Sequence, residues 1–172
     1  LVGSEMCIRD SRETDDMTES SDTPVPDLAV LQEAIASGDP VRAMPALTQL
    51  RFVSDADAVP LLVLGTEQKP FLVRSLSCSG LGYKRTEQGW EVLSRLLVND
   101  EDPDVRAEAA NALASYGVER AWPLLQNAFA ADDAWLVRCS ILSALAEQPE
   151  INLSWLICLL YTSPSPRDKH RS

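Results

Sequence analysis

Two carboxylates and one guanidinium recur at helical spacing between residues 87 and 95. Glu87, Glu91 and Arg95 lie four positions apart, so a helix would place all three on one face. Two carboxylates can act as general acid and general base, but only when their pKa values differ, and nothing around this pair predicts such a difference. The spacing is equally typical of a solvated or groove-lining charge stripe. We therefore name these three residues as candidate contacts for a partner, and we assign no catalytic residue.

The segment GLGYKRTEQGW, residues 80–90, places an aromatic and two basic side chains at a corner between two expected helices. Tyr83, Lys84 and Arg85 could contact a carboxylate of a partner through charge and the aromatic face. The same composition fits a helix end closed by glycine, where basic residues complement the helix dipole. Because turn chemistry alone explains the composition, the structural interpretation is favoured.

Few other side chains could perform chemistry. The single histidine, His170, lies two positions before the last residue, and the four cysteines form no CxxC pair. Motifs such as GxSxG, HExxH or a glycine-rich phosphate loop are absent from the sequence. Cys78 and Cys139 have apolar neighbours and are expected to be buried. Trp135 follows two aspartates and is expected to be a partly exposed contact. We expect no metal site and no cofactor.

The charge of the chain limits its partners. Asp and Glu number 26 against 15 Lys and Arg, which gives a formal net charge of −11. Binding to nucleic acid requires clustered basic residues that displace counterions from phosphates. The sequence therefore argues against a nucleic-acid partner and favours a protein partner.

A repeated pattern indicates which elements position these residues. Val-Arg pairs recur with a spacing of 32 at Val73-Arg74, Val105-Arg106 and Val137-Arg138. The same spacing of 32 separates Trp90 from Trp122. It also separates three leucines, Leu81, Leu113 and Leu145. Upstream, residues 39–42 (DPVR) resemble the same helix opening. Four units with a period near 32 are the signature of a helical solenoid.

One repeat is especially clear between Asp102 and Phe129. An Asp-Pro opening predicts a helix start, and Gly117 predicts its end before a second helix follows. Such a pair cannot bury its apolar faces alone, and small residues such as Ala109, Ala112 and Gly80 would let neighbouring helices pack closely. The predicted fold is an all-α solenoid of stacked antiparallel helix pairs.

The stretch DPDVRAEAANAL, with LVRSLSCSGLG and LVRCSILSALA as weaker copies, resembles HEAT repeats and, within them, the HEAT-like repeats of cyanobacterial phycobilisome lyases. The resemblance covers residues 39–157. It implies either a repeat scaffold or a protein that handles linear tetrapyrrole bilins. In the second case Arg85, Arg95 and Arg120 would contact the bilin propionates, and a phycobiliprotein would be the partner.

The resemblance also implies a structural role for the repeated arginines. Each would pack its stem in the first helix of a repeat and pair its guanidinium with a neighbouring acid or carbonyl. The expected ladder contains Arg42, Arg74, Arg106 and Arg138, with Asp102 and Asp104 as candidate acidic partners.

The two ends of the chain form a separate question. Residues 1–11 and 158–168 can be encoded by one DNA segment read in opposite directions, as a translated transposase sequencing adapter would be. We therefore expect residues 1–11 and 158–172 to be artefact, residues 12–26 to be a disordered acidic leader, and residues 27–157 to be a HEAT-like repeat domain truncated at its C-terminus. The apolar run at 157–160 is too short to span a membrane, and a cytoplasmic location is expected.

Two functional hypotheses follow. The first is a non-catalytic scaffold whose second helices, residues 87–99 and 119–131, line an acidic surface for a protein partner. The alternative is a bilin lyase subunit or bilin-handling factor acting on phycobiliproteins. The absence of reactive groups between residues 12 and 157 favours the scaffold.

Overall fold

The computed structural model describes residues 27–148 together with Cys158, Leu159 and Tyr161. These residues contain α-helices and one short 3-10 helix, and no strand lies among them. The elements are α1 (Leu28–Ala36), α2 (Pro40–Gln49), η1 (Leu50–Phe52), α3 (Asp55–Thr66), α4 (Phe71–Lys84), α5 (Glu87–Asn99), α6 (Pro103–Ala114), α7 (Val118–Ala131) and α8 (Trp135–Ala146). The artefact expected at residues 1–11, the leader expected at 12–26 and nearly all of 149–172 lie outside this part of the chain.

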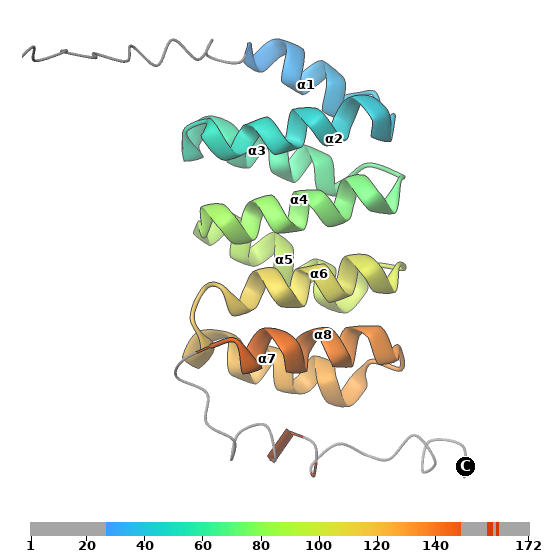
Figure 1. Cartoon of the computed structure of the whole chain (residues 1–172), viewed down its shortest axis with the longest axis vertical. Coiled ribbons are helices and arrows are strands. Elements are labelled where there is room, and N and C mark those ends of the chain that lie inside the picture. Colours follow the sequence, from blue (N-terminus) through green and yellow to red (C-terminus); the bar gives the residue numbers. More distant parts are fainter. Residues whose placement is uncertain (1–26, 149–157, 160, 162–172) are drawn as a thin grey trace, which may run out of the picture.

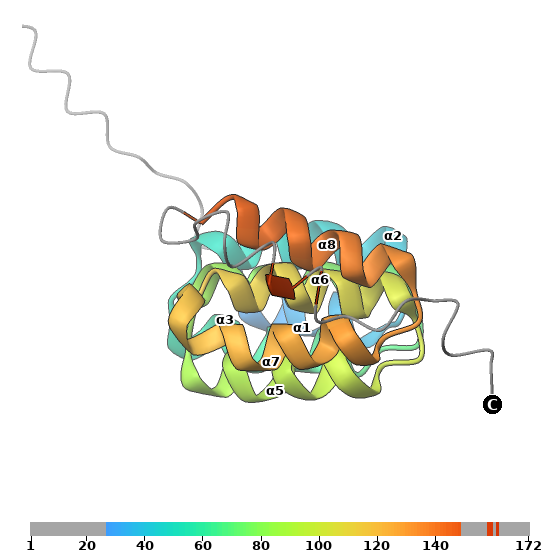
Figure 2. The ribbon, with the colours of Figure 1, turned by 90° about the horizontal axis from the view of Figure 1, so that it is seen from below.

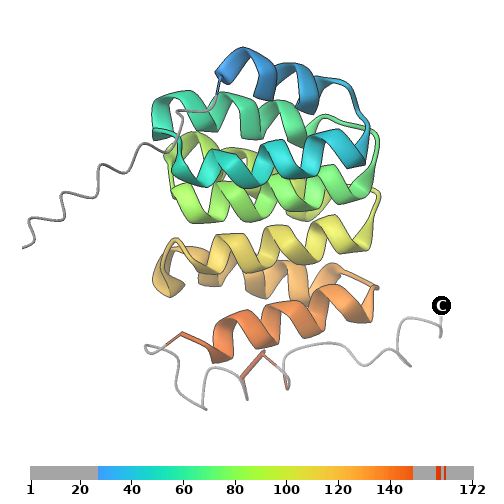
Figure 3. The same ribbon diagram turned by 45° about the horizontal axis from the view of Figure 1, so that its top comes forward.

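The helices stack in two layers. In one layer α2 contacts α4, α4 contacts α6, and α6 contacts α8. In the other layer α1 contacts α3, α3 contacts α5, and α5 contacts α7. Figure 1 shows the helices in order from α1 at the top to α7 and α8 at the bottom, and Figure 2, seen from below, separates α7 and α5 from α8 and α6. The 45° view in Figure 3 shows the same succession from the blue to the orange end. The predicted all-α solenoid is confirmed.

The helix starts follow from local chemistry. The carboxylates of Asp27, Asp39 and Asp102 accept the N–H two residues ahead at 2.9, 3.0 and 2.9 Å. Each cap satisfies one of the N–H groups that a helix start leaves without an internal partner. Pro40 and Pro103 follow two of these caps at positions where proline's missing N–H costs nothing. The helix predicted to open at Asp102 therefore begins as expected.

The repeated apolar residues form the core. Val73, Val105 and Val137 are each 0% exposed, and so are Leu81, Leu113 and Leu145. Full burial of a side chain of this size contributes roughly 1.5–3 kcal/mol. The 32-residue register therefore reflects a core position that each repeat fills in the same way.

Close contact between the first helices depends on small residues. A Cβ placed on Gly82 of α4 would lie 2.7 Å from the Cβ and 2.8 Å from the Cα of Ala112 in α6. A Cβ on Gly80 would meet the side chain of Leu62 at 2.4 Å. The backbone neighbour at Gly82 cannot move aside as a side chain can, so this glycine sets the distance between α4 and α6.

Candidate functional site

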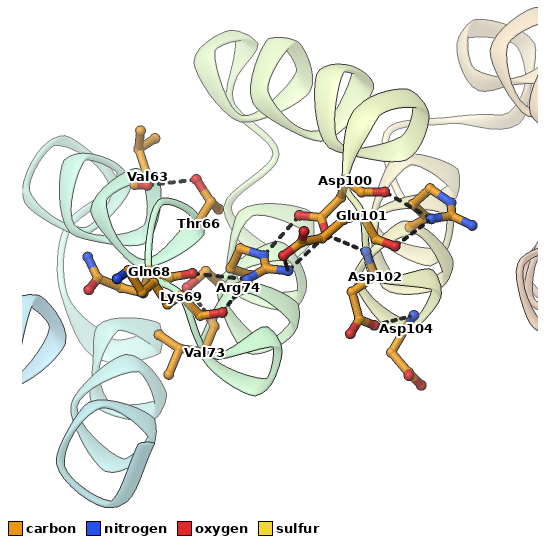
Figure 4. A network of polar contacts seen from close by, with 12 residues as sticks. Val63, Thr66, Gln68, Lys69, Val73, Arg74, Asp100, Glu101, Asp102 and Asp104 are labelled. Carbon is orange, nitrogen blue, oxygen red and sulfur yellow. Dashed lines mark hydrogen bonds and ion pairs between the residues drawn. The ribbon is translucent and has the colours of Figure 1, made fainter. Parts of the chain in front are cut away.

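Arg74 joins the loop before α4 to the end of α5. Its Nε and Nη2 donate to the carboxylate of Asp100 at 2.9 and 3.0 Å. Its Nη1 donates to the carbonyl oxygens of Gln68, at 3.1 Å, and Lys69. Figure 4 shows this guanidinium between the two loops. The side chains of Arg74 and Asp100 are only 9% and 6% exposed, so the ion pair is buried.

Arg106 repeats the arrangement one repeat later. Its Nε and Nη2 donate to the carboxylate of Asp132 at 2.7 and 3.1 Å. Its Nη1 donates to the carbonyls of Asp100 and Glu101 at 2.9 and 3.3 Å. In both repeats the aspartate follows the arginine by 26 positions and is the C-cap residue of a second helix, where its backbone N–H donates to the carbonyl four residues before it. We call these two arrangements the Arg–Asp rungs.

Arg74 and Arg106 of the predicted ladder do pair with carboxylates. The carboxylates belong to Asp100 and Asp132, and the predicted acidic partners Asp102 and Asp104 are not among them. The Asp102 carboxylate instead accepts the backbone N–H of Asp104 at the start of α6, and Asp104 is exposed in the first turn of that helix. The acids that pair with the arginines lie at the C-terminal ends of α5 and α7. Each guanidinium extends from the first helix of its repeat to the end of the second helix of the same repeat. Sequence reasoning missed Asp100 and Asp132, although their shared spacing of 32 was a usable signal.

Two other ladder residues differ from the rungs. Arg42 pairs with Glu33 of α1 at 3.0 Å, in an exposed setting, and Gln68 occupies the position 26 residues ahead where the rungs have aspartate. Arg138 is half-buried in α8, and residue 164, which would be its counterpart, lies outside the described residues. The buried rungs are thus seen in the two central repeats.

The ion pairs shift the titration of their members. The hydrogen bonds from Arg74 to Asp100 raise the pKa of the Arg74 guanidinium above its ordinary value, against the opposing effect of burial. Burial alone would raise the pKa of Asp132, but the hydrogen bonds from Arg106 and from the N–H of Ala134 outweigh it and lower that pKa. Asp132 is therefore held as a carboxylate.

A second cluster joins α5 to α7. Arg120 makes a bidentate pair with Glu87 at 2.7 and 2.6 Å, and its guanidinium lies 4.1 Å from the centroid of the Trp90 ring. Trp90 in turn meets Tyr116 edge to face at 5.4 Å, and the Tyr116 hydroxyl donates to the carbonyl of Leu81. The hydrogen bonds from Arg120 lower the pKa of Glu87, and burial raises the pKa of Tyr116 to about 12. Trp90 is half-buried, so it packs on the core while one face carries a cation.

The corner at residues 83–85 does not act as one site. Lys84 is 6% exposed; its ammonium donates to the carbonyls of Arg51 and Val53 and pairs with Asp55 at 3.2 Å. Tyr83 is 54% exposed, with the Arg51 guanidinium 4.8 Å from its ring centroid. Arg85 is exposed and itself takes the left-handed conformation that ends α4, at φ 53°. The expected glycine closure is therefore wrong, and Lys84 is a structural residue rather than a partner contact.

An apolar groove runs between the ends of α5 and α7. We call it the α5–α7 groove, and its lining is Leu97, Val98, Leu124, Asn127, Ala128, Ala131 and Asp132. Val98 is 63% exposed here. Glu91 and Arg95 are exposed along α5, before the groove. The lining residues lie toward the ends of α5 and α7, and Figure 1 shows the α5–α6 and α7–α8 loops that follow these ends at the right. Trp135 begins α8 on this edge and is 69% exposed, as predicted.

The predicted residues therefore divide among several places. Glu87 and Arg120 meet, whereas Arg85 lines a different groove with Ser79, Glu108 and Asn111, between α4 and α6. Arg95 is exposed on α5. The three arginines named as bilin contacts thus stand in three settings.

The cysteines differ from each other. Cys78 is fully buried, and burial raises the pKa of its thiol to about 12, which confirms the expectation for this residue. Cys139 is exposed on α8, so its expected burial was wrong. Among the described residues, no group of three or more His, Cys, Asp or Glu side chains is placed to hold a metal ion. In that same part of the chain, no helix is both long and apolar enough to span a bilayer.

Comparison with known proteins extends these observations. A family model described as HEAT repeats matches residues 59–146. A solved structure of human deoxyhypusine hydroxylase in complex with glycerol is similar, with a TM-score of 0.60 and 29% sequence identity over 70% of this chain. The match spans 42% of the hydroxylase chain, so less than half of that protein is represented. A search among curated proteins gives no match.

Proposed function

Because this chain belongs to the HEAT-repeat family, in which stacked helix pairs create extended surfaces, we propose that it is a non-catalytic scaffold that binds a protein partner through α5 and α7. The observation that carries the proposal is the α5–α7 groove, an apolar hollow with the exposed Val98 on its wall. Apolar hollows with exposed aliphatic side chains are typical anchor sites for a partner's side chain.

The surroundings of the groove support this role because they are rigid. Asp100 and Asp132 are the C-cap residues of α5 and α7, and the carboxylate of each is held by a bidentate arginine. A binding surface that is already ordered loses less conformational entropy when a partner binds. The Arg–Asp rungs therefore hold the two helices in the separation that the groove requires.

The distribution of charged side chains favours a scaffold over bilin handling. A bilin carries its propionates close together and would require convergent cations. Arg120 already makes two hydrogen bonds to Glu87, while Arg85 and Arg95 lie in other settings. A protein partner makes no such demand, because its contacts can be spread over several helices.

A peptide-display selection against the full chain tests the proposal. Twelve-residue random peptides enriched on the wild-type protein are tested against Val98→Glu, which places a charge in the groove. Val41→Glu is the matched control, since Val41 is 81% exposed on α2, outside the groove. We expect the enriched peptides to lose about tenfold or more in affinity for Val98→Glu, roughly 1.4 kcal/mol, and to bind Val41→Glu normally. Failure to enrich any peptide sensitive to Val98→Glu would contradict the proposal.

A further inference from the structure

The α5–α7 groove lies beside two acidic loops, and Asp132 of the second loop belongs to its lining. The α5–α6 loop carries Asp100, Glu101 and Asp102 directly after α5, and the α7–α8 loop carries Asp132 and Asp133 directly after α7. Val98 precedes the first loop by two residues, and Ala131 adjoins the second. The apolar lining and the acidic rim are therefore parts of one continuous surface.

The negative charge of this rim exceeds what the rungs neutralise. Arg74 and Arg106 make their close ion pairs with Asp100 and Asp132, and Arg74 makes a second, longer ion pair with Glu101. Glu101 has a side chain that is 89% exposed, with its nearest arginine nitrogen 3.9 Å away. Asp104 is exposed and extends the acidic surface into the first turn of α6. Arg95, exposed about one helical turn before Val98, is the opposing cation on this side of α5.

We infer that the α5–α7 groove receives a segment of a partner protein in which an apolar side chain is flanked by lysines or arginines; this inference rests on the proposed function. The apolar side chain enters between Val98 and Leu124, and the flanking cations lie against the acidic rim at Glu101. Charge complementarity of this kind raises association rates and excludes acidic competitors. The groove thus selects for charge as well as for an apolar anchor.

The groove floor explains why an aliphatic anchor fits. Leu97 is buried beneath it, Leu124 and Ala128 are half-buried, and Val98 and Ala131 are exposed at its margins. A side chain placed there covers apolar surface that is now in water, which contributes about 25 cal/mol per Å². Asn127 is the polar exception in the middle of the lining and can hydrogen-bond to the backbone of the incoming segment.

Two synthetic peptides distinguish this inference from the broader proposal. Both are fluorescein-labelled twelve-residue peptides with a central pair of leucines; one carries four flanking lysines, and the other carries glutamates at the same positions. Binding to the full chain is measured by fluorescence anisotropy at low and at high salt. We expect the lysine peptide to bind at least tenfold more tightly than the glutamate peptide, and the difference to shrink at high salt because exposed charges are screened.

Two variants of the protein test whether Glu101 is responsible for the preference for the lysine peptide. Glu101→Lys is expected to weaken the binding of the lysine peptide about tenfold. Glu119→Lys reverses an exposed charge at the opposite end of α7 and is expected to leave that binding unchanged. Circular dichroism confirms that each variant is folded. Equal binding of the two peptides, tighter binding of the glutamate peptide, or binding of neither would overturn the inference. The peptide-display selection decides the proposed function separately, because ligands that are sensitive to Val98→Glu without being basic would leave the scaffold proposal standing.

Discussion

The backbone carbonyl of Asp100 accepts a hydrogen bond from Nη1 of Arg106 at 2.9 Å, across the boundary between two repeats. The carboxylate of the same aspartate accepts both hydrogen bonds of Arg74 in the preceding rung. One residue therefore belongs to two consecutive Arg–Asp rungs, as Figure 4 shows. Neighbouring repeats are coupled through their loops in addition to their apolar cores.

Removing the charge of Asp100 tests this coupling. Asp100→Asn leaves the buried guanidinium of Arg74 without a carboxylate, and breaking a buried ion pair in this way costs about 3 kcal/mol. Chemical denaturation followed by circular dichroism measures the change in free energy of unfolding. Asp104→Asn is the matched control, because this exposed carboxylate contributes at most about 1 kcal/mol through the helix dipole. Equal losses in the two variants would show that the rung contributes nothing specific.

The pH dependence of stability follows from Asp132. Its pKa in the folded protein lies below the ordinary value of 3.8, so its contribution to stability is complete above that value and is lost as pH falls through the folded pKa. We expect the difference in free energy of unfolding between wild type and Asp132→Asn to be constant from pH 7 to about pH 5 and to shrink below pH 3.8. A difference that grows on acidification would have the wrong sign for a depressed carboxylate pKa.

Arg85 offers a stabilising substitution. Its φ of 53° lies in the left-handed region, which an L-residue occupies at a cost of roughly 1 kcal/mol and glycine does not. Arg85→Gly is expected to raise the free energy of unfolding by about 0.5–1 kcal/mol. Arg95→Gly, in the exposed interior of α5, should instead lower it by about 1 kcal/mol. Thermal melts of both variants provide the comparison, and a loss of stability in Arg85→Gly would contradict the argument.

Gly82 sets the approach of α4 to α6. Gly82→Ala places a Cβ 2.8 Å from the Cα of Ala112, so the helices must separate, at an expected cost of about 1–3 kcal/mol. Ser79→Ala on the exposed side of the same helix is the control and should be neutral or slightly stabilising. Chemical denaturation distinguishes the two. If Gly82→Ala were as stable as Ser79→Ala, the close contact would have no energetic weight.

The cysteines should differ in reactivity. Burial holds the Cys78 thiol protonated, with a pKa of about 12, whereas Cys139 is exposed. We expect iodoacetamide at pH 8 to label Cys139 in the folded protein and to label Cys78 only after denaturant is added. Peptide mass spectrometry reports each site separately. Labelling of Cys78 at the rate of Cys139 in the native protein would mean that α4 opens readily.

The helices and their register could be predicted from the amino-acid sequence. The 32-residue spacing of Val73, Val105 and Val137 identified positions that are all fully buried. Asp102-Pro103 likewise marked the start of α6, which ends at Ala114, and Gly117 marked the start of α7. These features could be predicted because helix caps depend on residues close in sequence, and because a repeated apolar position faces the same neighbour in every unit.

Only the tertiary structure decided the polar contacts. The acids that pair with Arg74 and Arg106 lie 26 residues downstream, and the nearer Asp102 is occupied by its own helix start. Lys84 is buried against the loop around Val53, 31 residues away, although the sequence presented it as an exposed contact. The α5–α7 groove arises where two helices from different repeats meet. Long polar side chains have several partners within reach, and the choice among them depends on how the loops of different repeats come together.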